Sequence, residues 1–203
     1  MSIISKVKFV LLAAAPLAWG GITINVADHG LTPGGQDAVP VVTKLLKKAR
    51  ESKEDVEIVF PKGTYHFYPD KAEVHELYIS NHDQPVKHPV GIPMVKLRNC
   101  TLNGNGSRFV FHGSMLPVLV QDSTGTSCRG FSVSYATPFS AEGRIVEIHG
   151  GRTTLEFDPK VNPPWGVEND TFILKGENGD HKPISAIVFN PDGMIVPTGG
   201  NGD

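Results

Sequence analysis

The sequence CTLNGNGSRFVFHGSMLPVLV, residues 100–120, sets three short apolar runs between turns rich in glycine and polar residues. The unit TSCRGFSVSY, residues 126–135, follows one repeat later and resembles it. A repeat of roughly 20–30 residues with several short strands is typical of a solenoid whose coils pair in parallel. We therefore predict a mainly β fold, a right-handed parallel β-helix. Gly104 and Gly106 are expected at turns between its faces, where φ values suit glycine.

Outward from this region, the preceding residues predict short strands and one helix. Asp37 is expected to cap the helix, and Pro40 suits its first turn. Apolar residues then recur every three or four positions and form one face, which predicts a helix from about Ala38 to Ser52 that covers the first coil. Strands are expected at residues 22–26, 56–60, 64–67 and 77–80.

Beyond about residue 137 the pattern changes to antiparallel strands. Residues 144–149 and 153–157 flank Gly150-Gly151-Arg152, which predicts a hairpin, and further strands are expected at 167–175 and 184–189. Because a meander does not continue a parallel coil, we predict two units. Residues 21–137 hold the capping helix and the first coils, and residues 138–203 hold part of an inserted antiparallel, barrel-like β domain.

The first residues predict a secretory signal peptide. Lys6 and Lys8 precede the apolar run 9–17, and Ala18 and Gly20 provide the small residues that signal peptidase prefers. The prediction is a signal peptide at residues 1–20 with cleavage near Gly20, and a secreted, periplasmic or cell-surface protein. No later segment is apolar for long enough to predict a membrane span.

Composition narrows the range of partners. The chain has 203 residues, with 19 basic and 21 acidic side chains and no basic stripe, so nucleic acid is not an expected partner. The eight histidines show no zinc-binding spacing, and no metal or other cofactor is expected. The polar ending 198–203 leaves the last coil uncovered, which predicts an N-terminal fragment of a longer protein.

Two places are candidates for sugar binding. Asn81, His82 and Asp83 form a dense polar cluster after a predicted strand. They either hydrogen-bond a sugar hydroxyl or simply form a turn closed by their own backbone. Trp165 follows two prolines, so a loop is expected there, with an exposed ring on which a sugar can stack.

The two cysteines leave two alternatives open. If Cys100 and Cys128 occupy equivalent sites on adjacent coils, their Cα atoms lie within disulfide range. If the units align on the strand around Phe131 instead, the pair is offset by two residues and too far apart. Free, buried thiols are the preferred interpretation. His112, which follows Phe111 at a strand end, is interpreted as a hydrogen-bonded structural residue.

Several motifs occur in a fixed order along the chain: FPKGTY at 60–65, ISNHD at 79–83, GIP at 91–93, LNGNGS at 102–107 and FHGSMLP at 111–117. This series resembles glycoside hydrolase family 110, the α-1,3-galactosidases. Residues 26–31 and the helix after them also resemble the N-terminal cap of pectin-lyase-like β-helices. The resemblance is closest over residues 22–140.

The resemblance implies an exo-acting, inverting, metal-independent hydrolase that removes terminal α-1,3-linked galactose, in some members from the blood group B antigen. Such a reaction uses two carboxyl groups about 6.5–9.5 Å apart. In that family they lie in later coils, so the catalytic residues are unknown here and expected beyond Asp203, and the chain alone is expected to be inactive. Asp83, Asp122, Asp158 and Asp170 share no motif. Two alternatives remain: a pectate-lyase-like β-helix enzyme, and a non-catalytic surface β-helix that binds glycans.

Overall fold

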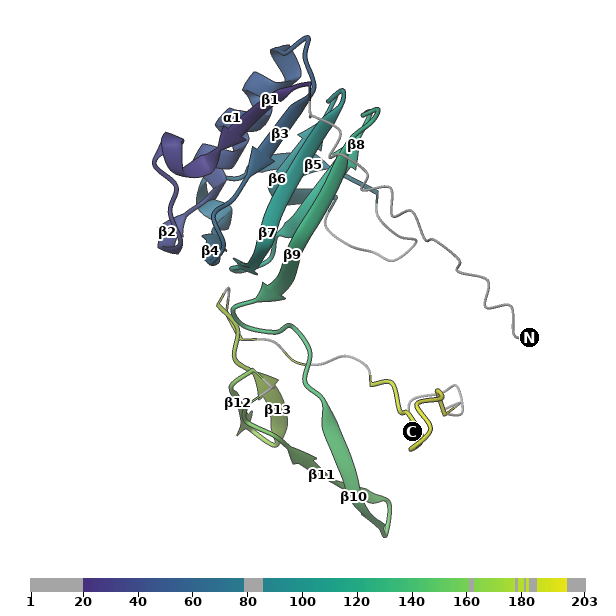
Figure 1. The fold of residues 1–203 in the computed structure, drawn as a ribbon. Coiled ribbons are helices and arrows are strands. Elements are labelled where there is room, and N and C mark those ends of the chain that lie inside the picture. Colours follow the sequence, from purple (N-terminus) through teal and green to yellow (C-terminus); the bar gives the residue numbers. More distant parts are fainter. Residues whose placement is uncertain are drawn as a thin grey trace, which may run out of the picture.

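The computed structural model describes residues 20–78, 86–160, 163–177, 179–180, 182 and 186–196. Within them the fold is mainly β, with one α-helix and two short 3-10 helices (Figure 1). The elements are β1 (Ile22–Asn25), η1 (Val26–His29), β2 (Gly34–Asp37), α1 (Val39–Glu51), β3 (Val56–Val59), β4 (Thr64–Phe67), η2 (Pro69–Lys71), β5 (Glu73–Glu76), β6 (Lys87–Val95), β7 (Cys100–Phe111), β8 (Leu116–Gln121), β9 (Ser127–Tyr135), β10 (Gly143–His149), β11 (Arg152–Phe157), β12 (Trp165–Glu168) and β13 (Thr171–Leu174).

Parallel pairing dominates the part of the chain from residue 22 to residue 135, which we call the coil region. The first half of β7 pairs in parallel with β3, and its second half with β4, while β9 pairs along both halves. A separate parallel pair joins β6 and β8. Thr101 and Ser127, which lie opposite each other on β7 and β9, are 26 residues apart, within the predicted repeat.

The strand β7 bends between its two halves. Asn105 and Gly106 have φ values of 50° and 76° there, so Gly106 occupies the predicted turn position. Gly104 serves a different purpose: a Cβ atom at this position would lie 2.6 Å from Cβ of Phe131. The missing side chain therefore lets β7 and β9 approach closely.

The core lies between the two larger sheets, the one that holds β7 and the one that holds β6. Large side chains from successive strands are fully buried in it, and their rings pack against one another: Phe60, Tyr65, Phe67, Phe109 and Phe111. The ring centres of Phe67 and Phe111 are 4.7 Å apart, and those of Phe109 and Phe131 are 4.5 Å apart. Such stacks add to the hydrophobic stabilisation of a column of buried residues.

The helix α1 matches its prediction to within one residue at each end. Its apolar face joins the same core through Val42, Leu45, Leu46 and Ala49. The helix lies near the edge of the sheet formed by β1, away from β9 (Figure 1). Ala38 rather than Asp37 is the N-cap residue. Asp37 still accepts a hydrogen bond from the amide of Val39 at 3.0 Å, because its carboxylate reaches one of the unpaired donors of the first turn.

The prediction of a strand at residues 77–80 was wrong for its first half. Leu77 and Tyr78 lie outside any strand, and residues 79–80 lie outside the described residues. The strand is β5, slightly earlier, which pairs antiparallel with β6. The charged residues of β5 have low strand propensity, so the sequence did not predict this strand, and its hydrogen bonds to β6 hold it in place.

The segment from residue 143 to residue 174, which we call the hairpin region, is antiparallel as predicted. It holds the hairpins β10–β11 and β12–β13. The single strand expected at 167–175 is a hairpin instead, because Asn169 and Asp170 adopt positive φ values and reverse the chain. Of the strand expected at 184–189, residues 184–185 lie outside the described residues, and Phe189 forms an antiparallel bridge with Ile195.

Both cysteines are free thiols. Cys128 lies opposite Leu102 rather than Cys100, so the two-residue offset applies. Burial, together with the neighbouring Cys128, raises the pKa of the Cys100 thiol to about 11, which keeps it protonated and unreactive at neutral pH. Among the described residues, no helix is both long and apolar enough to cross a membrane.

Candidate functional site

The predicted sugar-binding residues fall in two different places. Asn81, His82 and Asp83 lie outside the described residues. Trp165 begins β12 instead of lying in a loop, because it pairs with Leu174 across the hairpin. Its ring centre is 5.7 Å from those of Phe157 and Phe172, and 46% of the residue remains exposed. Trp165 therefore belongs to a small aromatic cluster and still offers ring surface to solvent.

A denser polar site lies where β4 and β7 end side by side. His66 on β4 lies opposite Val110 of β7, and His112 follows two residues later. Since alternate residues of a strand share a face, His66 and His112 project from the same outer face. His66 Nδ1 and His112 Nε2 are 2.8 Å apart and share a hydrogen bond.

Glu177 joins this site from far along the chain. Its Oε1 lies 2.9 Å from His112 Nδ1, and its Oε2 accepts a hydrogen bond from the amide of Gly113 at 2.6 Å. An ionised carboxylate only accepts hydrogen bonds, so His112 Nδ1 carries a hydrogen when Glu177 is ionised. In neutral His112 the other ring nitrogen, Nε2, is then an acceptor for His66 Nδ1. The three side chains form one directed hydrogen-bond chain.

Tyr68 completes what we call the histidine cluster, which consists of His66, Tyr68, His112 and Glu177. The Tyr68 ring stacks on the His112 ring at 4.0 Å, and the Tyr68 amide donates to Asp37 at 3.3 Å. Burial, followed by the charges of His112 and Arg108, lowers the pKa of His66. The cluster can therefore hold a neutral His66 beside a histidine paired with a carboxylate.

Sequence reasoning identified only part of this cluster. The alternation of buried Tyr65 and Phe67 places His66 on the outer face, which is the one signal the sequence contains for it. His112 is hydrogen-bonded at both ring nitrogens, consistent with its interpretation as a structural residue. No local pattern marks Glu177, because its partner lies 65 residues earlier in the sequence.

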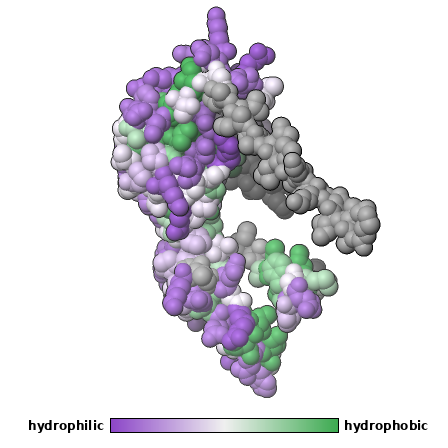
Figure 2. Space-filling view, in the orientation of Figure 1, coloured by the Kyte–Doolittle hydropathy of each residue, from purple (hydrophilic) through white to green (hydrophobic). Residues whose placement is uncertain are grey.

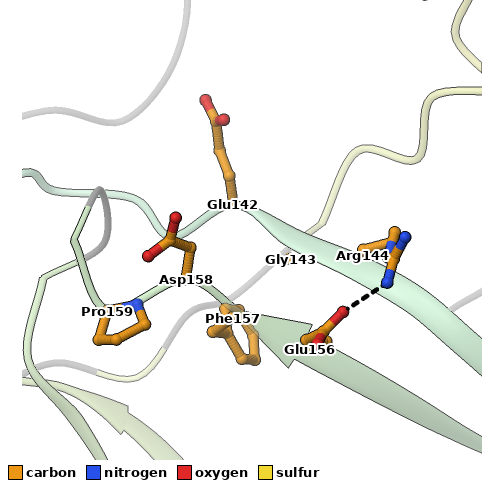
Figure 3. Close-up of a pocket in the computed structure, with 7 residues that line it drawn as sticks. All are labelled: Glu142, Gly143, Arg144, Glu156, Phe157, Asp158 and Pro159. Carbon is orange, nitrogen blue, oxygen red and sulfur yellow. Dashed lines mark hydrogen bonds and ion pairs between the residues drawn. The ribbon is translucent and has the colours of Figure 1, made fainter.

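Two hollows lie near the hairpin region. The first, of about 590 Å³, opens at the base of β10 and β11 and contains the ion pair between Arg144 and Glu156, at 2.7 Å. Figure 3 shows Glu142 and Asp158 on one side of Phe157 and this ion pair on the other. Both partners of the pair are largely exposed, so this hollow is a shallow, charged surface.

The second hollow, of about 410 Å³, lies beside the histidine cluster, and we call it the junction hollow. Three segments line it: the loop after β7, the residues after β9, and the segment after β13 that contains Glu177. The lining residues are Gly113, Ser114, Thr137, Pro138, Phe139, Gly176, Glu177, Gly179 and Asp180. Of the two hollows, this is the one connected to a fixed network of polar side chains.

The other candidate carboxylates lie apart from the histidine cluster. Asp122 and Asp170 are in turns, with φ values of 51° and 60°, while Asp158 lines the hollow at the base of β10 and β11. Asp83 lies outside the described residues. In the part of the chain that the structure describes, no group of three or more histidine, cysteine or acidic side chains is arranged to hold a metal ion.

Comparison with known proteins identifies the relatives of the chain. It is 36% identical over 170 residues to α-1,3-galactosidase B of Akkermansia muciniphila, a match that covers 83% of this chain and 21% of the relative. It is 35% identical over 166 residues to α-1,3-galactosidase A of Shewanella woodyi, a match that covers 81% of this chain and 27% of that relative. An α-1,3-galactosidase B of Phocaeicola vulgatus is 41% identical over 197 residues, covering 95% and 33%. No protein-family model matches the chain.

These matches extend over most of the chain but only about a fifth to a third of the relatives. Because the match to the Phocaeicola vulgatus protein covers 95% of the chain, it includes the coil region, where the ordered motifs lie. By sequence, therefore, the chain belongs with the α-1,3-galactosidases, as those motifs predicted, and it corresponds to a part of their length.

Proposed function

We propose that the protein to which this chain belongs is a secreted glycoside hydrolase that removes terminal α-1,3-linked galactose from glycans, acting from the chain end with inversion. The observation that carries the proposal is the match of 34–41% identity to several proteins named α-1,3-galactosidase over more than four-fifths of the chain. The substrate is a galactose-terminated oligosaccharide or glycoconjugate. The catalytic carboxylates are proposed to lie outside this chain.

The fold supports this proposal by its parallel coils. We propose that residues 21–137 begin a right-handed parallel β-helix capped by α1, and that residues 138–203 are part of an antiparallel β domain inserted into it. Parallel pairing of β3, β7 and β9, and of β6 with β8, supports the first unit. The hairpins β10–β11 and β12–β13 support the second.

Export by a signal peptide at residues 1–20 is also part of the proposal. It rests on the order of basic, apolar and small residues at the N-terminus. Sequencing the N-terminus of the protein recovered from outside the cytoplasm tests it. A mature chain that starts near Gly21 is expected, and a protein that keeps Lys6 and Lys8 would exclude cleavage.

The activity is tested on the complete gene product that carries this chain. Galactose-α-1,3-galactose is the substrate and galactose-α-1,4-galactose is the matched control, with the released sugar followed by proton NMR and with EDTA present in a parallel sample. Release of β-galactose from the α-1,3 disaccharide alone, unaffected by EDTA, is expected. Initial release of α-galactose would contradict inversion, and absence of any release would contradict the proposed activity.

The same preparation distinguishes the two alternatives. A calcium-dependent rise in ultraviolet absorbance on polygalacturonate would identify a lyase. Binding to galactosides on a glycan array without any cleavage would identify a surface binding protein.

A further inference from the structure

The junction hollow has the size and the wall structure of a small-molecule site. Its volume of about 410 Å³ falls within the range of roughly 300–1,000 Å³ that is usual for such sites. Its walls are tied to one another: the Tyr135 hydroxyl donates to the Met115 carbonyl at 3.0 Å, and the Phe139 ring packs edge-on against Tyr135 at 4.7 Å. The loop after β7 and the residues after β9 are thus held in one arrangement.

One wall of the hollow is fixed by the histidine cluster. Glu177 is held by His112 Nδ1 and by the amide of Gly113, so both carboxylate oxygens have a set position. Each oxygen has more than one lone pair, so each can accept a further hydrogen bond from a ligand hydroxyl. A positioned acceptor of this kind costs a ligand little reorganisation on binding.

The remaining lining chemistry suits a neutral, hydroxyl-rich ring. Ser114 and Thr137 add hydroxyl groups that donate and accept, and Phe139, 47% exposed, adds an apolar ring face. Among the described residues that line the hollow there is no cationic side chain, and the carboxylate of Asp180, which also lines it, is paired with Lys175 at 2.6 Å. The Glu177 carboxylate disfavours an anionic ligand, while an aromatic ring and hydroxyl groups match the two kinds of surface on a sugar.

We propose that the junction hollow is a binding subsite for one uncharged sugar ring. The ring stacks on Phe139 and donates hydroxyl hydrogens to Glu177. This inference rests on the proposed function for its ligand class, a galactoside. It adds a site that positions the glycan on the part of the protein between the coil region and the hairpin region.

The test uses methyl β-galactopyranoside, which an α-galactosidase does not cleave, so binding is measured independently of hydrolysis. Its Kd is determined by NMR titration on the complete gene product and on three variants. Phe139→Ala is expected to weaken binding about fivefold through the loss of ring contact. Thr137→Val, which keeps the side-chain shape, is expected to weaken it about threefold through the loss of a hydrogen bond. Phe189→Ala, an exposed aromatic outside the hollow, is the control and is expected to bind as the unchanged protein does.

A second probe tests the charge argument. Methyl β-galacturonoside has the same ring with a carboxylate, and it is expected to bind at least about threefold more weakly because of the Glu177 carboxylate. Thermal unfolding of each variant verifies that it is folded. If Phe139→Ala does not fold, the affinity of Thr137→Val alone tests the proposal. Three results would overturn the proposal. One is a Phe139 or Thr137 variant that binds the galactoside as tightly as the unchanged protein does, and another is a Phe189 variant that loses as much affinity as they do. The third is a galacturonoside that binds as tightly as the galactoside. A protein that binds the probe here but cleaves no α-galactoside would refute the proposed function and leave this subsite standing.

Discussion

The coil region and the hairpin region differ in how far their apolar side chains are buried. In the coil region, apolar residues such as Ile58, Leu102 and Phe109 are fully buried in a shared interior. In the hairpin region Ile148 and Val167 are 70% and 64% exposed. Figure 2 shows apolar surface gathered over the part of the molecule that holds β10, β11 and residues 186–196.

The difference follows from the way strands are stacked. A parallel coil places one inward side chain from every strand above the inward side chain of the strand before it, so each new strand extends an existing core. A two-stranded hairpin has two faces and no second layer to cover them, so it is marginally stable alone. We infer that the coil region carries most of the stability of the chain.

The largest expected effect is the loss of a ring from the coil core. Phe109 is fully buried and packs against Phe60, Tyr65, Phe67 and Phe131. Phe109→Ala is expected to lower the free energy of unfolding by about 3–5 kcal/mol, because the removed ring leaves a cavity among rigid neighbours. Urea denaturation followed by circular dichroism measures this.

The matched control is Phe189→Ala, at a residue that is 58% exposed beyond the hairpin region. Its expected cost is less than about 1 kcal/mol, since little packing is lost. Equal costs at the two positions would show that the exposed apolar residues are buried in the protein in solution, and the comparison between the two regions would then fail.

A smaller effect is expected from a half-buried ion pair on the coils. Glu57 on β3 accepts hydrogen bonds from Arg129 of β9 at 2.7 Å and from Asn103 of β7 at 3.0 Å, so it links three successive strands. Glu57→Gln is expected to cost about 1–2 kcal/mol, a value reduced by the exposure of Arg129. Urea denaturation at pH 7 measures the difference.

The same pair gives a pH dependence with a definite sign. The hydrogen bond from Arg129 lowers the pKa of Glu57 below its usual 4.5, although burial opposes this. A carboxyl group with a lowered pKa in the folded state stabilises the fold above its unfolded pKa, and this contribution is lost as the pH falls through the folded pKa. The gap between the unchanged protein and Glu57→Gln should therefore close as the pH falls below about 4.5. A gap that stays constant down to pH 3 would contradict this.

In the coil region, the sequence predicted the elements that have a clear local pattern and missed those that do not. The spacing of Val42, Leu45 and Ala49 predicted α1 to within one residue, and the repeat between residues 100 and 135 predicted β7 and β9. The sequence did not predict β6, because Pro89, Gly91 and Pro93 are typical of turns. Parallel pairing with β8 and antiparallel pairing with β5 override that local preference.

The candidate site was harder to predict for the same physical reason. His66 and His112 are 46 residues apart, and His112 and Glu177 are 65 apart, so their contact depends on the register of β4 with β7 and on the path of the chain after β13. No periodicity in a single sequence encodes such contacts. The aromatic cluster around Trp165 was missed because two prolines before it predicted a loop.

The histidine cluster, at the edge of the coil region, is tested by the titration of His66. Burial and the charges of His112 and Arg108 lower its pKa from 6.5. Because the unfolded chain then binds a proton that the folded chain does not, stability falls as the pH drops below 6.5 toward the folded pKa. NMR titration of the histidine ring protons should give a midpoint for His66 below 6.5.

The His112→Asn variant sharpens this result, since it removes one of the charges that face His66. The midpoint of His66 should rise in the variant and remain below 6.5, because burial and Arg108 are unchanged. A midpoint that does not move would show that His112 does not hold its position beside His66, and the histidine cluster would then lose its central contact.

The smallest effect is expected from the ion pair of the hairpin region. Arg144 and Glu156 lie 2.7 Å apart, closely matching the distance between Arg129 and Glu57, but their side chains are 77% and 62% exposed. Water screens such a pair, and ordering two long side chains costs entropy, so Glu156→Gln should change the free energy of unfolding by less than about 0.5 kcal/mol. Urea denaturation beside Glu57→Gln measures both under one condition. Since the two pairs share residue types and distance, a larger loss at Glu156 than at Glu57 would mean that burial is not what distinguishes the hairpins from the coils.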